Sequence, residues 1–428
     1  MSGGQTRAPA PAGTAGRRVL VVGAGIVGIC SAAYLQRAGF QVTVVDRLAP
    51  GEGCSFGNAG NVSPGAVVPY SMPGTLLNVP RWLFDPLGPL SLPPAHLPKL
   101  LPWLLGWMAA SRPSQVRRIS KAMHALHQPV FEAYAPLLAA AGGSDLIVMT
   151  GQLYVSSKPG PLDSPLAREL RQAAGIRAED ISGPQVREVE PTLAPHFQSG
   201  LLLPDNGTCL NPHRVVTVLA EQVARDGGAI RRGAVRGFRM EAGVPVAALT
   251  EDGEIAFDRL VLAAGAWSNA LSRQLGLDVR LEAERGYHVT IADPGPMPRI
   301  PVTNRDSSFA TAPMEMGLRL AGTAEYAGLD APPNWRRARI LLEHGRRMYP
   351  GLSTARVSEW MGCRPTLPDG LPIIDRSARH PNVVFAFGHS HFGLTAAPAT
   401  GRIVADLAAG RTPQSIDIAP YRASRFAA

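Results

Sequence analysis

Cysteine is scarce in this 428-residue chain and follows no metal-binding or disulfide spacing. The four residues, Cys30, Cys54, Cys209 and Cys363, lie far apart and form no C-x-x-C pair. Zinc sites and disulfide frameworks use closely spaced or paired cysteines. We therefore expect neither, and no metal. Unpaired cysteines also favour a reducing compartment, so a cytoplasmic location is expected.

Lysine is equally scarce. Only Lys99, Lys121 and Lys158 are lysines among the 42 basic residues, although the net charge is +9. The charge is not concentrated in a run of five basic residues, and no zinc-finger or RNA-binding signature accompanies it. Nucleic acid is therefore not an expected partner, and the charge is interpreted as a solvated basic surface.

Long uninterrupted apolar runs are missing as well. No stretch of 18 apolar residues lacks both a proline and a charge, so a membrane-spanning helix is not expected. Residues 74–110 are apolar but broken by prolines, and they contain Trp82, Trp103 and Trp107. Two interpretations remain open: a buried or lid segment, or a peripheral patch on the inner face of the cytoplasmic membrane.

A glycine-rich strand-helix-strand pattern follows residue 18. Residues 19–22 predict a buried parallel strand, residues 26–37 a helix that ends near Gly39, and residues 42–45 a second strand. The turn between the first strand and the helix reads G-x-G-x-x-G. This complete context predicts a Rossmann-like unit that binds a dinucleotide.

The spacing of the three glycines suits a pyrophosphate. Gly23 permits a tight turn, Gly25 lets the backbone approach the phosphates, and Gly28 lets the helix pack on the strand. The helix N-terminus offers free N–H groups to the phosphates. Asp46, 18 residues beyond Gly28, is expected to accept hydrogen bonds from ribose hydroxyls. The motif alone does not separate NAD from FAD.

Several segments together resemble the FAD-dependent amine and D-amino-acid oxidoreductases of the D-amino-acid oxidase superfamily. They are the unit at 19–46, LVLAAGAWS at 260–268, GCRPTLPDGLPII at 362–374 and FGHSHFGLT at 387–395. The loop SFGNAGNVSPG at 55–65 is closest to the bacterial D-amino-acid dehydrogenase branch. The resemblance spans residues 17–415. No second complete G-x-G-x-x-G occurs, which argues against a separate NAD(P)H domain.

The resemblance implies an α/β plus α+β fold: a doubly wound, Rossmann-like FAD domain interleaved with an antiparallel-sheet substrate domain. The FAD domain is expected at 17–72, 195–275 and 355–415. The substrate domain is expected at 73–194 and 276–354. Residues 1–16 are rich in Gly, Ala and Pro and are expected to be a disordered lead.

The resemblance also implies the FAD contacts. The expected residues are Gly23, Gly25, Ile26, Val27, Gly28, Asp46, Arg47, Ser55, Asn58, Ala59, Gly60, Asn61, Val235, Ala264, Gly265, Trp267, Gly362, Gly388, His389, His391, Phe392, Gly393, Leu394 and Thr395. A helix that begins near Gly393 would stabilise the negative charge of reduced flavin. Relatives with covalent flavin tether it through a histidine near the N-terminal loop or a cysteine ahead of the G-x-R-P segment. Since residues 23–65 contain no histidine and Cys363 lies inside that segment, FAD is expected to be non-covalent.

Four residues are expected at the substrate. Arg364 matches the arginine that binds the substrate carboxylate, a role that suits the planar guanidinium. Tyr287 is the candidate for a second carboxylate contact, and His288 is a candidate that could equally be a hydrogen-bonded strand histidine. His391 could bind a substrate hydroxyl, which would point to a D-hydroxyproline, or pack at the flavin edge; both interpretations stay open.

The implied reaction is oxidation of a D-amino or cyclic D-imino acid by hydride transfer from Cα to flavin N5. The route requires no obligatory protein base, since orientation and electrostatics supply the catalysis. Sarcosine oxidases activate oxygen with a lysine over the flavin, and no lysine occurs after Lys158. A dehydrogenase that passes electrons to a quinone or dye-like acceptor is therefore favoured. The alternatives are an oxidase or demethylase of a secondary or N-methyl amine, and a flavin electron-transfer subunit. The oligomeric state is not indicated.

Overall fold

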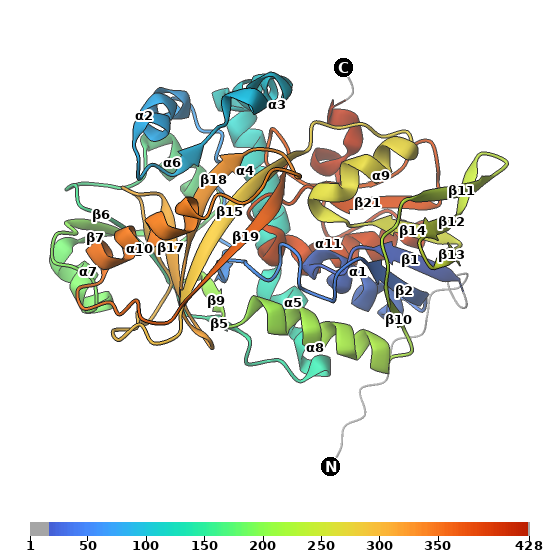
Figure 1. Ribbon diagram of the computed structural model, residues 1–428, viewed down its shortest axis with the longest axis horizontal. Coiled ribbons are helices and arrows are strands. Elements are labelled where there is room, and N and C mark those ends of the chain that lie inside the picture. Colours follow the sequence, from blue (N-terminus) through green and yellow to red (C-terminus); the bar gives the residue numbers. More distant parts are fainter. Residues whose placement is uncertain (1–16, 427–428) are drawn as a thin grey trace, which may run out of the picture.

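The glycine motif follows an inner strand of a six-stranded sheet. This sheet forms one half of the molecule (Figure 1). The computed structural model describes residues 17–426, so the expected disordered lead at 1–16 lies outside the described residues. In spatial order the strands are β10 (Ala229–Arg232), β2 (Gln41–Asp46), β1 (Arg18–Val22), β14 (Arg259–Leu262), β21 (Val383–Phe387) and β20 (Ile373–Arg376). Neighbours are parallel except β20, which is antiparallel to β21.

Helices cover one face of this sheet. They are α1 (Ile26–Arg37), α8 (Pro212–Arg225) and α11 (Gly393–Ala408), with α4 (Pro113–His127) and α5 (Val130–Ala141) packed on them. The first helix ends as predicted, because Gly39 has a positive φ of 91°. Helix α8 begins at Pro212 because the Asn211 side chain accepts a hydrogen bond from the Arg214 N–H (3.0 Å).

The opposite face of the sheet is covered mainly by strands. A three-stranded antiparallel sheet of β11 (Gly237–Glu241), β12 (Val244–Thr250) and β13 (Gly253–Ala256), together with α9 (Ser268–Gln274), packs there. Ala248 and Phe257 pack among the apolar side chains that β1 and β14 present on this face. The expectation of a doubly wound sheet is therefore wrong: only one face carries the large helices, because the crossover to β14 is built of strands.

The second half of the molecule is a nine-stranded sheet. Its path runs β19 (Val357–Thr366), β15 (Glu282–Ile291), β18 (Gly317–Tyr326), β17 (Phe309–Met314), β16 (Val302–Asn304), β6 (Gln152–Ser156), β8 (Ser199–Leu203) and β7 (Glu179–Ser182), while β4 (Leu90–Ser91) pairs with β18. It is mostly antiparallel, as expected, but β16 is parallel to β6 and β4 to β18. Helix α10 (Arg336–Met348) covers one face, where its apolar side chains meet those of β15 and β18.

Two of the expected domain boundaries need correction. Strands β8 and β19 belong to the nine-stranded sheet although they fall in segments assigned to the FAD domain. Helices α4 and α5 lie inside the segment 73–194 but share the core of the nucleotide sheet. Strand pairing and helix packing decide to which half of the molecule each element belongs. Position along the chain does not.

The remaining elements lie outside these two large sheets. They are β3 (Asn61–Val62), β9 (Gly207–Cys209) and β5 (Ile147–Met149), which form a small sheet; α2 (Val79–Phe84), α3 (Leu97–Ala110), α6 (Pro165–Ala173) and α7 (Gly183–Val189); and the 3-10 turns η1 (Thr75–Asn78), η2 (Pro94–His96), η3 (Gly265–Trp267), η4 (Ala419–Tyr421) and η5 (Ala423–Phe426). Across residues 17–426, no helix is both long and apolar enough to cross a membrane.

Candidate active site

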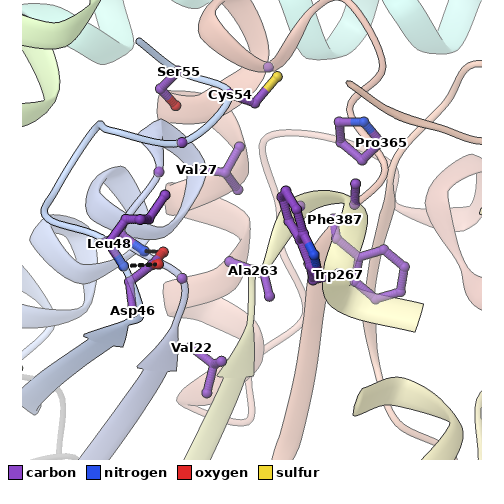
Figure 2. A pocket seen from close by; sticks show the side chains of 18 of the residues that line it. Val22, Val27, Asp46, Leu48, Cys54, Ser55, Ala263, Trp267, Pro365 and Phe387 are labelled. Atoms are coloured by element: carbon purple, nitrogen blue, oxygen red, sulfur yellow. Dashed lines mark hydrogen bonds between the residues drawn. The ribbon is translucent and has the colours of Figure 1, made fainter. Parts of the chain in front are cut away.

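An elongated cavity of about 430 Å³ opens at the carboxyl edge of the parallel sheet. It lies where β2 and β14 flank β1, the switch point at which such sheets bind ligands. Figure 2 shows Asp46 and Leu48 on one side of it and Trp267 and Phe387 on the other. The predicted cofactor residues that line it are Gly23, Gly25, Ile26, Val27, Asp46, Arg47, Ser55, Asn58, Val235, Ala264, Gly265, Trp267, Gly388, His389, Gly393 and Leu394.

The turn between β1 and α1 can be made only with glycine. Gly23 has φ +116°, and a Cβ there would lie 2.3 Å from the Ala263 carbonyl oxygen. A Cβ on Gly28 would lie 1.9 Å from the Gly23 carbonyl oxygen. Gly25, by contrast, faces the cavity, and its nearest obstacle is the Ser55 hydroxyl at 3.3 Å. The backbone at Gly25 is therefore open to close approach by a ligand.

One end of the cavity suits an adenosine. The Asp46 carboxylate accepts hydrogen bonds from the backbone N–H groups of Ala24 (2.8 Å) and Leu48 (3.0 Å), which fixes it at the cavity wall (Figure 2). The Arg47 guanidinium lies 3.8 Å from the centre of the Trp267 ring, a cation–π contact between opposite walls. A carboxylate held in this way can accept hydrogen bonds from ribose hydroxyls.

Two helix N-termini point into the same cavity. The residues that precede α1 and α11, Gly25 and Phe392, make no capping side-chain hydrogen bond, and the first residues of both helices line the cavity. In α1 the Ile26 N–H donates to the Ser55 hydroxyl (2.9 Å), which occupies one of the N-terminal N–H groups. The other N-terminal N–H groups and the helix dipoles favour negative charge. The glycine turn, the Asp46 carboxylate and the two helix N-termini fit a dinucleotide such as FAD.

Other predicted contacts lie outside the cavity lining. They are Gly28, Ala59, Gly60, Asn61, Gly362, His391, Phe392 and Thr395. Gly362 makes room for a protein ring instead, since a Cβ there would lie 2.0 Å from the Trp360 ring. The Thr395 hydroxyl accepts from the Ser63 N–H (3.2 Å), so it holds the 55–65 loop against α11.

Two protonated thiols line the cavity that were not predicted as cofactor contacts. Burial raises the pKa of Cys54 to about 12 and also raises the pKa of Cys363. Cysteine reacts as a thiolate. Both sulfurs are therefore weak nucleophiles at neutral pH.

Arg364 lies next to the cavity-lining residue Pro365 and keeps most of its donors free. Its Nη1 donates to Glu284 Oε1 (2.9 Å) and to the Thr323 carbonyl (3.3 Å). Within residues 17–426, Nε and Nη2 make no hydrogen bond, and the side chain is 18% exposed. A guanidinium with two unused donors can bind a planar carboxylate. Thr323 has a positive φ of 56° and a buried hydroxyl without a partner in the described chain, which marks local strain beside this arginine.

Glu284 is the centre of this cluster and was missed by sequence reasoning. Its carboxylate accepts hydrogen bonds from Arg364, from His391 Nε2 (2.9 Å), from the Thr366 hydroxyl (3.1 Å) and from the Tyr326 hydroxyl (3.4 Å). Burial alone would raise its pKa, but His391, Arg364 and Thr366 outweigh burial and lower the pKa to about 2. Its strand, EAERGYHVTI, also carries Glu282, Arg285 and His288, so nothing in the sequence singles out Glu284.

Tyr287 is not a contact of this cluster, which corrects the expectation. Along β15 the side chains of Glu284 and His288 lie on one face, and Tyr287 lies on the other, which packs against α10. Its hydroxyl donates to Glu325 (2.6 Å) and accepts from the Asn334 N–H (2.9 Å). Both hydrogen bonds hold it in the core of the nine-stranded sheet.

His288 is a hydrogen-bonded strand histidine, one of the two expected alternatives. Its Nδ1 donates to the Gly57 carbonyl (3.2 Å), and its ring stacks on Trp360 with centroids 5.0 Å apart. Burial lowers its pKa to about 3, so it is neutral at physiological pH. It supports the loop that carries Gly57.

His391 lies between the cavity and Glu284. Its neighbours Ser390 and Gly393 line the cavity, and its Nε2 lies 2.9 and 3.1 Å from the two Glu284 oxygens. The Tyr70 ring, which sequence reasoning also missed, covers it with a centroid distance of 4.4 Å. The site thus combines a cation, an imidazole hydrogen-bonded to a carboxylate, and a nucleotide cavity. No cluster of three metal-ligating side chains occurs in the described chain.

Comparisons with known proteins agree with this geometry. The family model DAO, described as FAD dependent oxidoreductase, matches residues 18–407. A D-amino-acid oxidase from Bradyrhizobium diazoefficiens is 38% identical over 425 residues, covering 96% of this chain and 99% of that protein. A D-amino acid dehydrogenase from Xanthobacter autotrophicus is 35% identical over 420 residues, with coverage of 96% and 99%. In fold, the chain is similar to L-proline dehydrogenase from P. horikoshii, with a TM-score of 0.72, 19% identity and coverage of 97% and 98%.

Proposed function

Because this chain belongs to the DAO family of FAD-dependent oxidoreductases that act on amino acids, we propose that it is a dehydrogenase of D-amino acids or cyclic D-imino acids. The observation that carries the proposal is Arg364, which has two unused donor nitrogens and stands in the chain between the cavity-lining residues Cys363 and Pro365. An electron-transfer subunit has no need of such a carboxylate site. D-hydroxyproline is the narrower substrate to test.

FAD, when bound, accepts a hydride from the substrate Cα. The residues of this chain would bind and orient the reactants. Arg364 would hold the substrate carboxylate, Asp46 the ribose, and the N-termini of α1 and α11 the charges of the cofactor. The protonated thiols of Cys54 and Cys363 support non-covalent FAD, because neither presents a thiolate to the cavity.

The electron acceptor is proposed to be a quinone or another non-oxygen acceptor. The three lysines of the chain lie on α3 and α4 and after β6, none of them on an element that lines the cavity. The relatives carry both names, oxidase and dehydrogenase. An oxidase of a secondary or N-methyl amine is the second candidate.

The test is anaerobic bleaching of the bound flavin by a substrate panel. The panel contains D- and L-amino acids, sarcosine and other N-methyl amino acids, and D- and L-proline with their hydroxylated forms. Reduction by D-amino or D-imino acids, followed by dye reduction without hydrogen peroxide in air, supports the proposal. Reduction by N-methyl amines alone, or rapid peroxide formation, would favour the second candidate. Flavin that no panel member reduces would contradict both.

A peripheral membrane contact through residues 74–110, at the inner face of the cytoplasmic membrane, is part of the proposal. Helices α2 and α3 both lie at the upper edge of Figure 1. The exposed large apolar side chains of this segment are Leu76, Leu77, Leu83, Phe84, Leu97, Leu101, Leu105 and Met108, with Leu77 and Phe84 more than four-fifths exposed. Exposed Arg81, Lys99 and Arg112 accompany them, against the single acidic Asp85. This combination suits an anionic lipid surface.

The inner side of α3 lies on the candidate active site. The Trp103 Nε1–H donates to the Thr366 carbonyl (3.0 Å), and the Trp103 ring lies 5.4 Å from that of Tyr326. Both Thr366 and Tyr326 hydrogen-bond Glu284. One helix would therefore separate the lipid surface from the substrate, which suits a lipid-soluble electron acceptor.

A further inference from the structure

An amino acid must lose a proton before it can be oxidised by hydride transfer. At neutral pH its nitrogen is an ammonium, which has no lone pair to stabilise the positive charge that develops at Cα. One proton therefore has to move from the nitrogen to an acceptor. A positioned side chain can accelerate such a step about 10²- to 10⁴-fold.

Glu284 cannot be this acceptor, although it is the carboxylate of the cluster. Four donors already occupy its oxygens. A carboxylate has about four lone-pair positions, so none is left to take a proton from an ammonium. Its effect is on His391 instead, as a carboxylate orients the imidazole in a catalytic triad.

The contact with Glu284 sets the tautomer of His391. Since an ionised carboxylate only accepts hydrogen bonds, Nε2 carries a hydrogen, and in the neutral imidazole the lone pair is on Nδ1. Nδ1 makes no hydrogen bond within residues 17–426, and the side chain is 25% exposed. In the sequence His391 stands between the cavity-lining residues Ser390 and Gly393, so its unused nitrogen lies near the cavity.

The charges around His391 balance once a zwitterionic substrate is bound. The titratable groups in contact with His391 are Glu284 on β15 and Tyr70 in the loop before η1. Arg364 on β19 and Tyr326 on β18 contact the same Glu284 carboxylate, and Cys54 lies within electrostatic range of Glu284 and Arg364. The two phenols and the thiol are neutral near pH 7. The substrate carboxylate would offset Arg364, and Glu284 would offset an imidazolium. Protonation of His391 therefore leaves two neutral pairs.

We propose that His391 is the catalytic base that deprotonates the substrate ammonium and that Glu284 is its positioning residue. An N–H bond of the substrate breaks, an Nδ1–H bond forms on His391, and the electron pair stays on the nitrogen. The resulting neutral amine is the form from which bound FAD would take the Cα hydrogen as hydride. The inference rests on the proposed function, and it adds a base where the sequence alone predicted none.

The test is the pH profile of anaerobic flavin reduction, from pH 6 to 10, in the holoenzyme. The substrate is D-alanine or whichever D-amino acid of the panel reduces the flavin fastest. In His391→Gln the rate should fall about 10²- to 10⁴-fold at pH 7. The rate of this variant should then rise about tenfold for each unit of increasing pH, because the substrate loses its ammonium proton to bulk solvent instead of to His391. Added imidazole should partly restore His391→Ala.

The other variants separate positioning from folding. Glu284→Gln should move the acid limb of kcat/KM to lower pH, because removing a negative charge lowers the basicity of His391. The matched control is a second glutamate–histidine pair, formed by Glu282 on the same strand and His96 of η2, whose Oε1 and Nε2 atoms lie 3.0 Å apart. Glu282→Gln and His96→Gln should keep the wild-type profile.

The outcomes distinguish failure of the proposed base from failure of the proposed function. A His391→Gln loss that is equal at every pH, or a profile identical to wild type, would overturn the base while the proposed function stands. Wild-type flavin that no D-amino acid reduces would overturn the proposed function and the base with it. FAD content of each variant, measured by absorbance, shows whether a loss reflects an unloaded site.

Discussion

The Arg364 guanidinium lies directly over Gly286, the residue two positions after its ion-pair partner on β15. A Cβ on Gly286 would lie 2.2 Å from Nη2 of Arg364 and 2.3 Å from its Cζ. Because Gly286 has no side chain, the Arg364 guanidinium, which is proposed to bind the substrate carboxylate, can occupy this position. The Trp360 ring likewise occupies space that a side chain on Gly57 or Gly362 would fill.

Gly286→Ala should displace the guanidinium and raise the KM for the amino acid strongly, with kcat less affected. The new methyl group meets the working end of Arg364, which must move away from Glu284. Steady-state kinetics measure the effect, and FAD content is the control. A KM equal to wild type would show that Arg364 does not need this position.

Arg364→Ala should raise KM about 10- to 150-fold and leave FAD bound. A charge-assisted hydrogen-bonded contact is worth about 1.5–3 kcal/mol. Arg364→Lys should have a KM close to that of the alanine variant, because lysine lacks the planar guanidinium that can make two parallel hydrogen bonds to a carboxylate. Unchanged kinetics in the alanine variant would remove the carboxylate role. Equal loss for a substrate without a carboxylate would do the same.

Asp46→Ala should weaken FAD retention without preventing folding. The carboxylate is the proposed ribose acceptor, and two backbone N–H groups hold it in place. Asp46→Asn, which keeps one acceptor oxygen, should lose less. Flavin released through gel filtration measures retention. Acid precipitation of the wild type should leave all the colour in solution, and yellow precipitate would contradict non-covalent binding.

Stability should fall as the pH drops from about 6.5 towards 4. Burial lowers the pKa of His127 to about 4, whereas an unfolded histidine has a pKa of about 6.5. Between these values the unfolded chain binds protons that the folded chain does not, so unfolding is favoured. His127→Gln keeps a donor for the Ala66 carbonyl and should flatten this part of the Tm–pH curve. Exposed His196→Gln is the matched control, and parallel curves for wild type and His127→Gln would contradict the prediction.

The holoenzyme should float with vesicles that contain anionic phospholipid, and less with zwitterionic ones. Each basic residue near an anionic surface adds about 1 kcal/mol, so added salt should weaken binding. Leu77→Glu combined with Phe84→Glu should lower binding at least about tenfold, because it charges the most exposed apolar positions. Met149→Glu and Met240→Glu are controls on other exposed apolar positions. Equal losses in the controls, or no flotation of wild type, would contradict a lipid contact.

The sequence by itself determined the nucleotide-binding unit. The G-x-G-x-x-G turn, the end of α1 at Gly39 and the capped start of α8 all depend on residues a few positions apart. Local backbone preference and capping chemistry decide such features, so they can be predicted from neighbouring residues.

The tertiary structure alone decided which side chains meet at the substrate. Glu284 and Arg364 are 80 residues apart and become neighbours only through the register of β15 and β19. Side chains alternate along a strand, so a shift of one position moves a residue to the opposite face. Because of this alternation, His288 lies beside Gly57, whereas Tyr287 lies in the core of the nine-stranded sheet. Pairing between distant strands leaves no local signal, and it was pairing that brought Glu284 to Arg364 and His391.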